Sequence, residues 1–308
     1  MREFLFHWTR SFLQGAEAVV CMLGLFLYTG PVYAAAVPAR YETSVKTKSI
    51  MEKKYLQPGP YSTAYLEQPV SRNWKKYEVW YPAELAESEK TYPVLLLSNG
   101  TGVHASSAKA MLKHFASWGF IVVGNEEDNS WQGVSAENGL TWILGENERE
   151  GSVFYHRVNT EAIGAFGHSQ GGVGTINAIT VQPHHVVYKA AVSESPTQIP
   201  LAQKLKWPFY PKKVTVPIFY VSSNGFFDSN LIIPPARLEQ MFDMTTHSPF
   251  RVMAIRKKAD HGDMLYKADG YVTAWFLYWL QGDENAGTVF QKDGELARNP
   301  LYETVRIE

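Results

Sequence analysis

The sequence predicts an α/β protein with one mostly parallel central sheet that helices cover on both faces. Three observations lead to this prediction: apolar strand-like stretches, helix-like stretches between them, and a length of 308 residues, enough for one large domain with a buried core. Continuously apolar strands are typical of parallel sheets, because such strands are buried on both faces. We therefore expect functional residues on the loops at the carboxyl ends of the strands.

The strands are predicted where the chain is apolar or alternates between polar and apolar residues, at residues 77–81, 94–97, 120–123, 162–166, 188–192, 216–221 and 250–255. The first of them alternates and stops at Pro82, as an early strand would. Helical spacing of apolar residues or a helix-compatible composition predicts helices between and after the strands, at residues 105–118, 135–144, 173–181 and 271–280.

The N-terminus has the pattern of a secretion signal. Positive charge at Arg2 and Arg10 precedes an apolar run at residues 18–28, and small residues that suit cleavage follow up to Ala34. We therefore expect residues 1–34 to be a signal peptide, with an uncleaved membrane anchor as the alternative. The mature protein is then expected outside the cytoplasm, either secreted, periplasmic or at the cell surface.

The remaining chain divides into two parts. Residues 35–75 are expected to form an N-terminal arm or linker with the first edge elements of the sheet, and residues 76–308 the catalytic domain. Within the arm, residues 35–58 are predicted to be a tether or loosely packed, because Lys, Thr and Ser are frequent there and the Gln-Pro-Gly-Pro run at 57–60 cannot form regular structure.

Charge and cysteine content narrow the choice of partners. The formal net charge of −1 gives no support for nucleic acid or an anionic membrane surface as a partner. The single cysteine, Cys21, lies within the apolar N-terminal run, so a cleaved chain would form no disulfide. We expect a monomer without a stable membrane partner, unless the N-terminal segment stays uncleaved.

The most informative motif is Gly-x-Ser-x-Gly, which is centred on Ser169 and runs from Gly167 to Gly171. It follows the strand-like residues 162–166 and precedes helix-compatible sequence, which is the context of a nucleophile elbow. The two glycines let strand and helix approach closely, so that the serine hydroxyl is exposed above the sheet. The N–H of Gln170 would then lie at a helix start, where it stabilises negative charge. The alternative is a chance match in a glycine-rich turn.

A serine hydroxyl needs a base within hydrogen-bond reach, and the base needs an acid that orients it. Behind a nucleophile elbow, the acid and then the base follow the serine along the chain. His261 comes shortly after the last predicted strand and is the predicted base, whereas the other histidines after Ser169 fit loops or turns. Asp228 is the first carboxylate after the strand at 216–221 and is the predicted acid, with a helix cap or turn residue as the alternative.

A glycine-containing loop follows the strand at 94–97. Its sequence, Ser-Asn-Gly-Thr-Gly-Val at 98–103, lets the backbone approach a substrate closely. We expect the N–H of Thr101 to complete an oxyanion hole with the N–H of Gln170. A phosphate-binding loop is the alternative, but the Lys-Ser/Thr ending of such loops is missing. The expected chemistry requires no metal and no organic cofactor.

These motifs, in this order, resemble the α/β-hydrolase superfamily. The sequence is most similar to the bacterial cutinases and polyester hydrolases, and to related dienelactone-hydrolase-like and chlorophyllase-like esterases. The likeness spans residues 76–282 and is most specific at residues 98–102, 114–123, 167–172 and 259–261. It implies an α/β-hydrolase fold, a triad of Ser169, Asp228 and His261, and an oxyanion hole formed by Thr101 and Gln170.

The chain also departs from the cutinase pattern. Gln170 stands where these enzymes usually carry Met after the serine, and residues 222–227 separate the acid from its strand. The polyester hydrolases carry a substrate-clamping Trp shortly after the strand that matches 188–192, whereas this chain has Ser-Glu-Ser-Pro-Thr at 193–197. A flat clamp for an aromatic polymer is therefore not predicted. Gly100, His168 and Trp131 are the candidate substrate-binding residues.

Together these features predict a secreted serine carboxylic-ester hydrolase, a carboxylesterase or cutinase-like enzyme that acts on a small or polymeric ester. Two alternatives remain open. One is an acyltransferase that uses the same residues with an alcohol as acceptor. The other is a non-catalytic surface protein that retains the fold.

Overall fold

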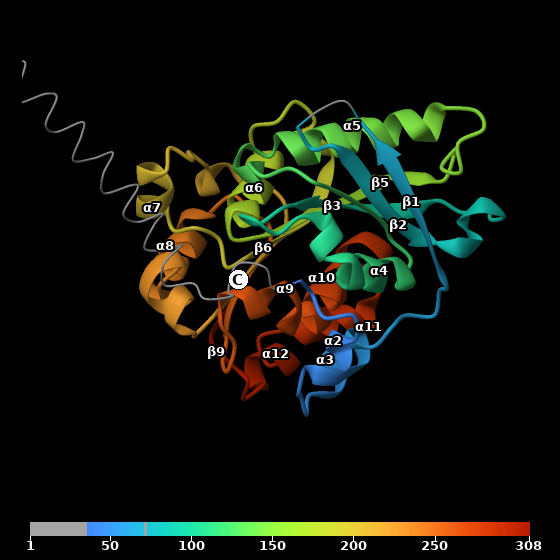
Figure 1. Cartoon of the computed structure of the whole chain (residues 1–308). Helices are drawn as coiled ribbons and strands as arrows, with labels where there is room; N and C mark the ends of the chain where they lie inside the picture. Colours follow the sequence, from blue (N-terminus) through green and yellow to red (C-terminus); the bar gives the residue numbers. More distant parts are fainter. Residues whose placement is uncertain (1–35, 71–72) are drawn as a thin grey trace, which may run out of the picture.

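The computed structural model describes residues 36–70 and 73–308 (Figure 1). The signal peptide predicted for residues 1–34 lies outside the described residues. Nine strands of the described chain form one sheet in the order β1-β2-β4-β3-β5-β6-β7-β8-β9. The pairs from β4 through β3, β5, β6 and β7 to β8 are parallel, and only the outer strands β1, β2 and β9 pair in antiparallel fashion. The predicted mostly parallel sheet is thus confirmed.

The strands are β1 (Thr63–Pro69), β2 (Lys76–Pro82), β3 (Tyr92–Ser98), β4 (Ile121–Asn125), β5 (Val158–His168), β6 (Tyr188–Glu194), β7 (Ile218–Ser223), β8 (Arg251–Arg256) and β9 (Tyr302–Ile307). Each predicted strand has a counterpart between β2 and β8. The strand β9 was not predicted, because it lies at a sheet edge and is only partly buried, which leaves a weak apolar pattern.

The helices are α2 (Tyr41–Ser44), α3 (Ile50–Leu56), α4 (Lys109–Ser117), α5 (Val134–Glu148), α6 (Gln170–Ala178), α7 (Ile199–Lys204), α8 (Pro235–Met244), α9 (Met264–Lys267), α10 (Asp269–Gln281), α11 (Glu284–Gly287) and α12 (Glu295–Arg298). Helices α5 and α6 cover one face of the sheet, and α4 and α10 cover the other (Figure 1).

Two apolar cores result, one on each face of the sheet. Along β3, Val94 and Leu96 belong to the core beneath α5, whereas Leu95 and Leu97 belong to the core beneath α4 and α10. All four side chains are buried. Successive side chains of a strand point to opposite faces, so a strand with a core on each side must be apolar throughout.

The segment 36–56 is packed, in contrast to the loose tether expected there. Its helices α2 and α3 lie beside the C-terminal helices α10 to α12 (Figure 1). The side chains of Tyr41 and Tyr55 are buried, and so is Glu52, whose carboxylate accepts hydrogen bonds from Asn299 Nδ2 (2.8 Å) and Tyr302 Oη (3.0 Å). The composition of this segment suggested a solvated arm. A local pattern could not show the packing, because the partners of Glu52 come from the far end of the chain.

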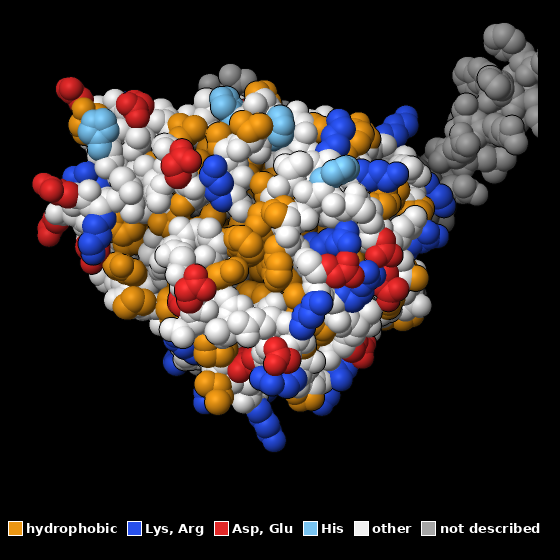
Figure 2. All heavy atoms as spheres, turned by 180° about the vertical axis from the view of Figure 1, so that it is seen from behind, with side chains coloured by type: hydrophobic (Ala, Val, Ile, Leu, Met, Phe, Trp, Pro, Cys, Tyr) orange, Lys and Arg blue, Asp and Glu red, His pale blue; other side chains and the backbone are white. Residues whose placement is uncertain are grey.

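The surface carries charges of both signs. On the face shown in Figure 2, Lys and Arg side chains alternate with Asp and Glu, around a central hollow where hydrophobic side chains gather. Within residues 36–70 and 73–308, no helix has both the length and the apolar character needed to cross a membrane.

Candidate active site

The predicted elbow lies between a strand and a helix. The strand β5 ends at His168 and α6 begins at Gln170, so that Ser169 alone forms the turn. Its backbone has φ 61° and ψ −118°, a conformation that a residue with a side chain rarely adopts. The N–H of Ser169 donates to the carbonyl oxygen of Glu194 at the end of β6 (2.9 Å). This bond holds the strained turn on the neighbouring strand.

Glycine is required on both sides of the serine. A Cβ atom added to Gly171 would lie 2.0 Å from the carbonyl oxygen of Ser98, and one added to Gly167 would lie 2.5 Å from the carbonyl oxygen of Gly171. Both contacts are with main-chain atoms, which cannot move aside easily. The flanking glycines of the motif therefore follow from the close approach of β3, β5 and α6.

Three residues that are far apart in the sequence meet at the elbow. The Nε2 atom of His261 lies 3.0 Å from the hydroxyl oxygen of Ser169, and its Nδ1 atom lies 2.6 Å from Oδ1 of Asp228. The Asp228 side chain is fully buried, whereas those of Ser169 and His261 retain some exposure. The structure thus brings the predicted nucleophile, base and acid together in one hydrogen-bonded chain.

The carboxylate of Asp228 is well supplied with donors. Its Oδ2 atom accepts hydrogen bonds from the Ser195 hydroxyl (2.6 Å), the Ser223 hydroxyl (2.6 Å) and the Ser223 N–H (2.9 Å). Burial by itself raises the pKa of Asp228, but the charge of His261 and these hydrogen bonds outweigh it and hold the pKa below its ordinary value. The group therefore remains a carboxylate that can stabilise a charged imidazole.

The residues between β7 and the acid form a helical turn. The N–H of Ser229 donates to the carbonyl oxygen of Gly225 (3.0 Å), and this turn brings the Asp228 carboxylate back to Ser223 at the end of β7. Asp228 also begins a short π-helix, Asp228–Ile232. A Cβ atom on Gly225 would lie 2.5 Å from Oδ1 of Asp260, so only glycine fits between the two loops. The additional residues before the acid are thus accommodated by coiling the chain. Single π-helical turns are frequent at functional sites.

Asp260 has a role that the sequence analysis did not assign. Its carboxylate caps the short helix His261–Asp263 by accepting the N–H of His261 (2.8 Å), and Asp263 in turn accepts the N–H of Asp260 (2.9 Å). This reciprocal pair is a capping box, which fixes the backbone that carries the imidazole. The acidic residues three positions apart were the available signal. For Ser195 and Ser223 the sequence offers no comparable signal.

The two predicted oxyanion donors follow two neighbouring strands of the sheet, Thr101 after β3 and Gln170 after β5. Thr101 follows β3 in a tight turn in which Val103 N–H donates to Gly100 O (3.1 Å), and Gln170 is the first residue of α6. Neither N–H of Thr101 and Gln170 has a hydrogen-bond acceptor among the described residues. Both N–H groups thus have no acceptor within the described structure, as the predicted role in an oxyanion hole requires.

A sequence model of the PET hydrolase-like family matches residues 45–261, which include the glycine-containing loop, the elbow and all three residues of the hydrogen-bonded chain. The protein belongs to the PET hydrolase-like family. It therefore has the α/β-hydrolase fold and belongs to a class of ester hydrolases. A search of curated proteins found no match.

In this PET hydrolase-like protein, His168 lies beneath the site. Its ring packs against that of His261 with centroids 4.4 Å apart, and its Nε2–H donates to the main-chain oxygen of His261 (2.8 Å). Its side chain is buried, and a Cβ atom on Gly100 would lie 3.2 Å from its Nδ1 atom. This placement differs from the substrate contacts expected of His168 and Gly100, because both are covered. His168 supports the loop of His261 instead.

Burial, together with the nearby charge of His261, lowers the pKa of His168 from 6.5 to about 3. As the pH falls below 6.5, the unfolded chain takes up a proton at this residue and the folded chain does not, so stability falls with pH. We expect the free energy of unfolding of wild type, taken relative to that of the His168→Asn variant, to fall by about 2 kcal/mol from pH 7 to pH 5. Urea unfolding at both pH values measures this difference.

The exposed His247 provides the matched control, because His247→Asn removes an imidazole that solvent reaches in both states. The pH dependence of its stability measures what removing a solvent-accessible imidazole does by itself, and this is subtracted from the change seen for His168→Asn. Equal pH dependence for wild type and His168→Asn would contradict a neutral, buried His168.

Residues 193–197, where the polyester hydrolases carry the substrate-clamping Trp, contain no Trp in this chain. After β6, Ser195 directs its hydroxyl to Asp228 and so supports the acid. Trp131 lies on the short helix Ser130–Gln132, half-buried, and its carbonyl oxygen accepts a hydrogen bond from Asn177 Nδ2 (2.8 Å). This hydrogen bond holds the main chain of Trp131, and the residue remains partly exposed. In residues 36–70 and 73–308, no group of three or more His, Cys, Asp or Glu side chains is arranged to hold a metal ion.

Proposed function

We propose that the protein is a secreted serine carboxylic-ester hydrolase that works through an acyl-enzyme on Ser169. The single observation that carries this proposal is the continuous chain from the Ser169 hydroxyl through His261 to Asp228, with contacts of 3.0 Å and 2.6 Å. A serine without a base at this distance is a poor nucleophile. Secretion is inferred from the N-terminal sequence pattern alone.

In the first half-reaction, the Ser169 oxygen attacks the ester carbonyl carbon while Nε2 of His261 takes the hydroxyl proton. The carbonyl oxygen becomes an oxyanion, which the N–H groups of Thr101 and Gln170 stabilise. Asp228 holds the imidazole in the tautomer with a proton on Nδ1 and stabilises the imidazolium that forms. The carbon–oxygen bond of the ester then breaks, and His261 returns the proton to the departing alcohol.

In the second half-reaction, water replaces the alcohol. His261 takes a proton from the water as its oxygen attacks the acyl carbon, and the same two N–H groups stabilise the second oxyanion. The acid is released and the proton returns to Ser169. The proposed substrate is a small or polymeric carboxylic ester, and no cofactor takes part in these steps.

Active-site labelling tests this proposal. The purified protein is incubated with a fluorophosphonate probe, digested and mapped by mass spectrometry, while hydrolysis of p-nitrophenyl butyrate is followed in parallel. We expect one probe molecule per protein, attached to the peptide that contains Ser169, and a loss of turnover in proportion to the fraction of protein labelled. If the folded protein shows no labelling and no turnover, the proposal is refuted and a non-catalytic role is favoured. Ester formation from an added alcohol in excess of free acid would identify an acyltransferase.

A further inference from the structure

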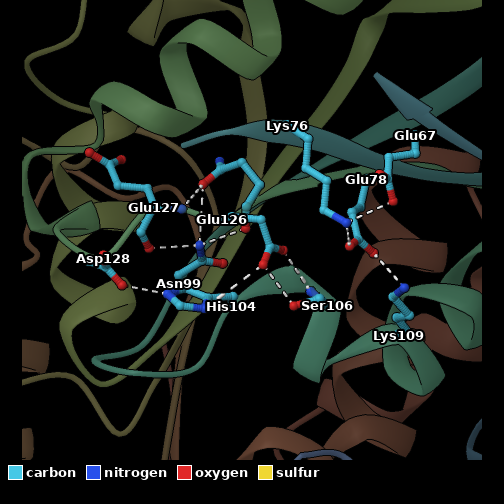
Figure 3. Close-up of polar contacts among 11 residues, drawn as sticks. Glu67, Lys76, Glu78, Asn99, His104, Ser106, Lys109, Glu126, Glu127 and Asp128 are labelled. Atoms are coloured by element: carbon cyan, nitrogen blue, oxygen red, sulfur yellow. Dashed lines mark hydrogen bonds and ion pairs between the residues drawn. The ribbon is translucent and has the colours of Figure 1, made fainter. Parts of the chain in front are cut away.

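The loop that carries Thr101 is anchored through Asn99. The Asn99 side chain is buried, and its amide nitrogen donates to Asn125 O (2.8 Å), Asn125 Oδ1 (3.2 Å) and Glu127 O (3.0 Å). All three acceptors belong to the segment 125–130, which begins at the last residue of β4 (Figure 3). One side chain thus ties the first residue after β3 to the neighbouring loop.

The same segment is also tied to the elbow. The N–H of Ser130 donates to the side-chain oxygen Oε1 of Gln170 (2.9 Å), and the hydroxyl of Ser130 donates to the main-chain oxygen of Asn99. Ser130 is fully buried between the two. A chain of hydrogen bonds therefore runs from the Gln170 side chain through Ser130 to Asn99, two residues before Thr101.

We propose that Gln170, through its side chain, and Ser130 and Asn99 are positioning residues that fix the distance between the two oxyanion donors. The inference depends on the proposed function, since it concerns the same site. Gln170 would contribute twice, because its N–H faces the oxyanion while its side chain holds the loop that carries the second donor.

The need for such an anchor follows from the loop's own sequence. Gly100 and Gly102 flank Thr101, and Gly102 has a φ of 69°, so the backbone around the donor has few steric restraints of its own. An oxyanion hole is effective only when its donors are held in place before the charge develops. Fixing the main chain at Asn99 leaves only Gly100 between the anchor and Thr101.

The far end of the loop is held separately. Ser106 donates its N–H (3.0 Å) and its hydroxyl (2.8 Å) to the two carboxylate oxygens of Glu126, and His104 Nε2 lies 2.5 Å from Oδ1 of Asp128 (Figure 3). These contacts join the same two loops but lie farther along the chain from Thr101. Ser106→Ala is therefore a matched control for Ser130→Ala, because each removes one hydroxyl between the same pair of segments.

The experiment compares Gln170→Met, Ser130→Ala, their double variant and Ser106→Ala with wild type. Methionine keeps the main-chain N–H and the approximate shape but removes the acceptor for Ser130. We expect kcat for p-nitrophenyl acetate to fall about 10- to 100-fold in both single variants, with KM changed less than about twofold. The double variant should lose little more than either single variant, because both interrupt one chain. Ser106→Ala should retain wild-type kcat.

Inhibition by phenylboronic acid separates positioning from general stability. The tetrahedral adduct that phenylboronic acid forms on Ser169 places an oxygen in the oxyanion hole. We therefore expect the affinity of the variants for phenylboronic acid to fall in parallel with kcat. A positioning role does not require the midpoint of urea unfolding to change. Unchanged kcat and boronate affinity in Gln170→Met and Ser130→Ala overturn the inference. Wild type is assayed first with the fluorophosphonate probe, because a wild type that neither reacts nor turns over refutes the proposed function itself.

Discussion

Replacing Ser169 with alanine is expected to lower kcat for a short-chain p-nitrophenyl ester by a factor on the order of 10⁴ to 10⁶. The change removes the hydroxyl oxygen that lies 3.0 Å from Nε2 of the His261 base. The oxyanion donors and the rest of the site remain, so a small residual rate over the uncatalysed reaction should persist. Initial-rate kinetics with highly purified variant measure the loss.

The fold should survive this change, because the Ser169 side chain makes no hydrogen bond other than the one to His261 among those found in the described structure. The unfolding midpoint and the far-UV circular dichroism spectrum serve as checks. Ser62→Ala, at the exposed serine that directly precedes β1, is the matched control and should keep full activity. Wild-type kcat in Ser169→Ala would eliminate the acyl-enzyme mechanism.

The second large effect is expected for Asp228→Asn, with kcat reduced by a factor of about 10⁴. An amide at this position can present its NH₂ group to Nδ1 of His261, which favours the tautomer with the proton on Nε2. That tautomer cannot accept the Ser169 proton. The amide also carries no charge to stabilise the imidazolium. Steady-state kinetics at a pH near 7 measure the reduction.

Asp293 is exposed, and Asp293→Asn therefore controls for the loss of one carboxylate. Its kcat should equal that of wild type. Because Oδ2 of Asp228 accepts three hydrogen bonds from Ser195 and Ser223, Asp228→Asn can also lower stability, so kcat is compared at a temperature where both variants are folded. An Asp228→Asn enzyme with kcat within tenfold of wild type would show that another group orients His261.

The segment after β6 shows how one short stretch can serve several parts of a site. The carbonyl oxygen of Glu194 holds the N–H of Ser169, and the next residue, Ser195, directs its hydroxyl to Asp228. Ser195 itself has a φ of 39°, and its N–H donates to Val221 O (2.7 Å). The nucleophile and the acid are thus held by adjacent residues at the end of one strand.

The predictions that succeeded depended on local patterns. The strand at 94–97 was visible because burial on two faces demands continuous apolar residues. The elbow was visible because its strained turn needs glycine at fixed positions around Ser169. Where the pattern was not local, prediction failed: Glu52 looked like part of a solvated arm because its partners Asn299 and Tyr302 lie at the other end of the chain.

By itself, the sequence determined the class of sheet, the elbow and the candidates for base and acid, since each is encoded in neighbouring residues or in their order along the chain. Only the tertiary structure decided that His261 reaches Ser169 across 92 positions and Asp228 across 33. It also decided that the Gln170 side chain is linked to Asn99. The physical reason is that such contacts depend on strand order and on the paths of loops, which a local pattern does not specify.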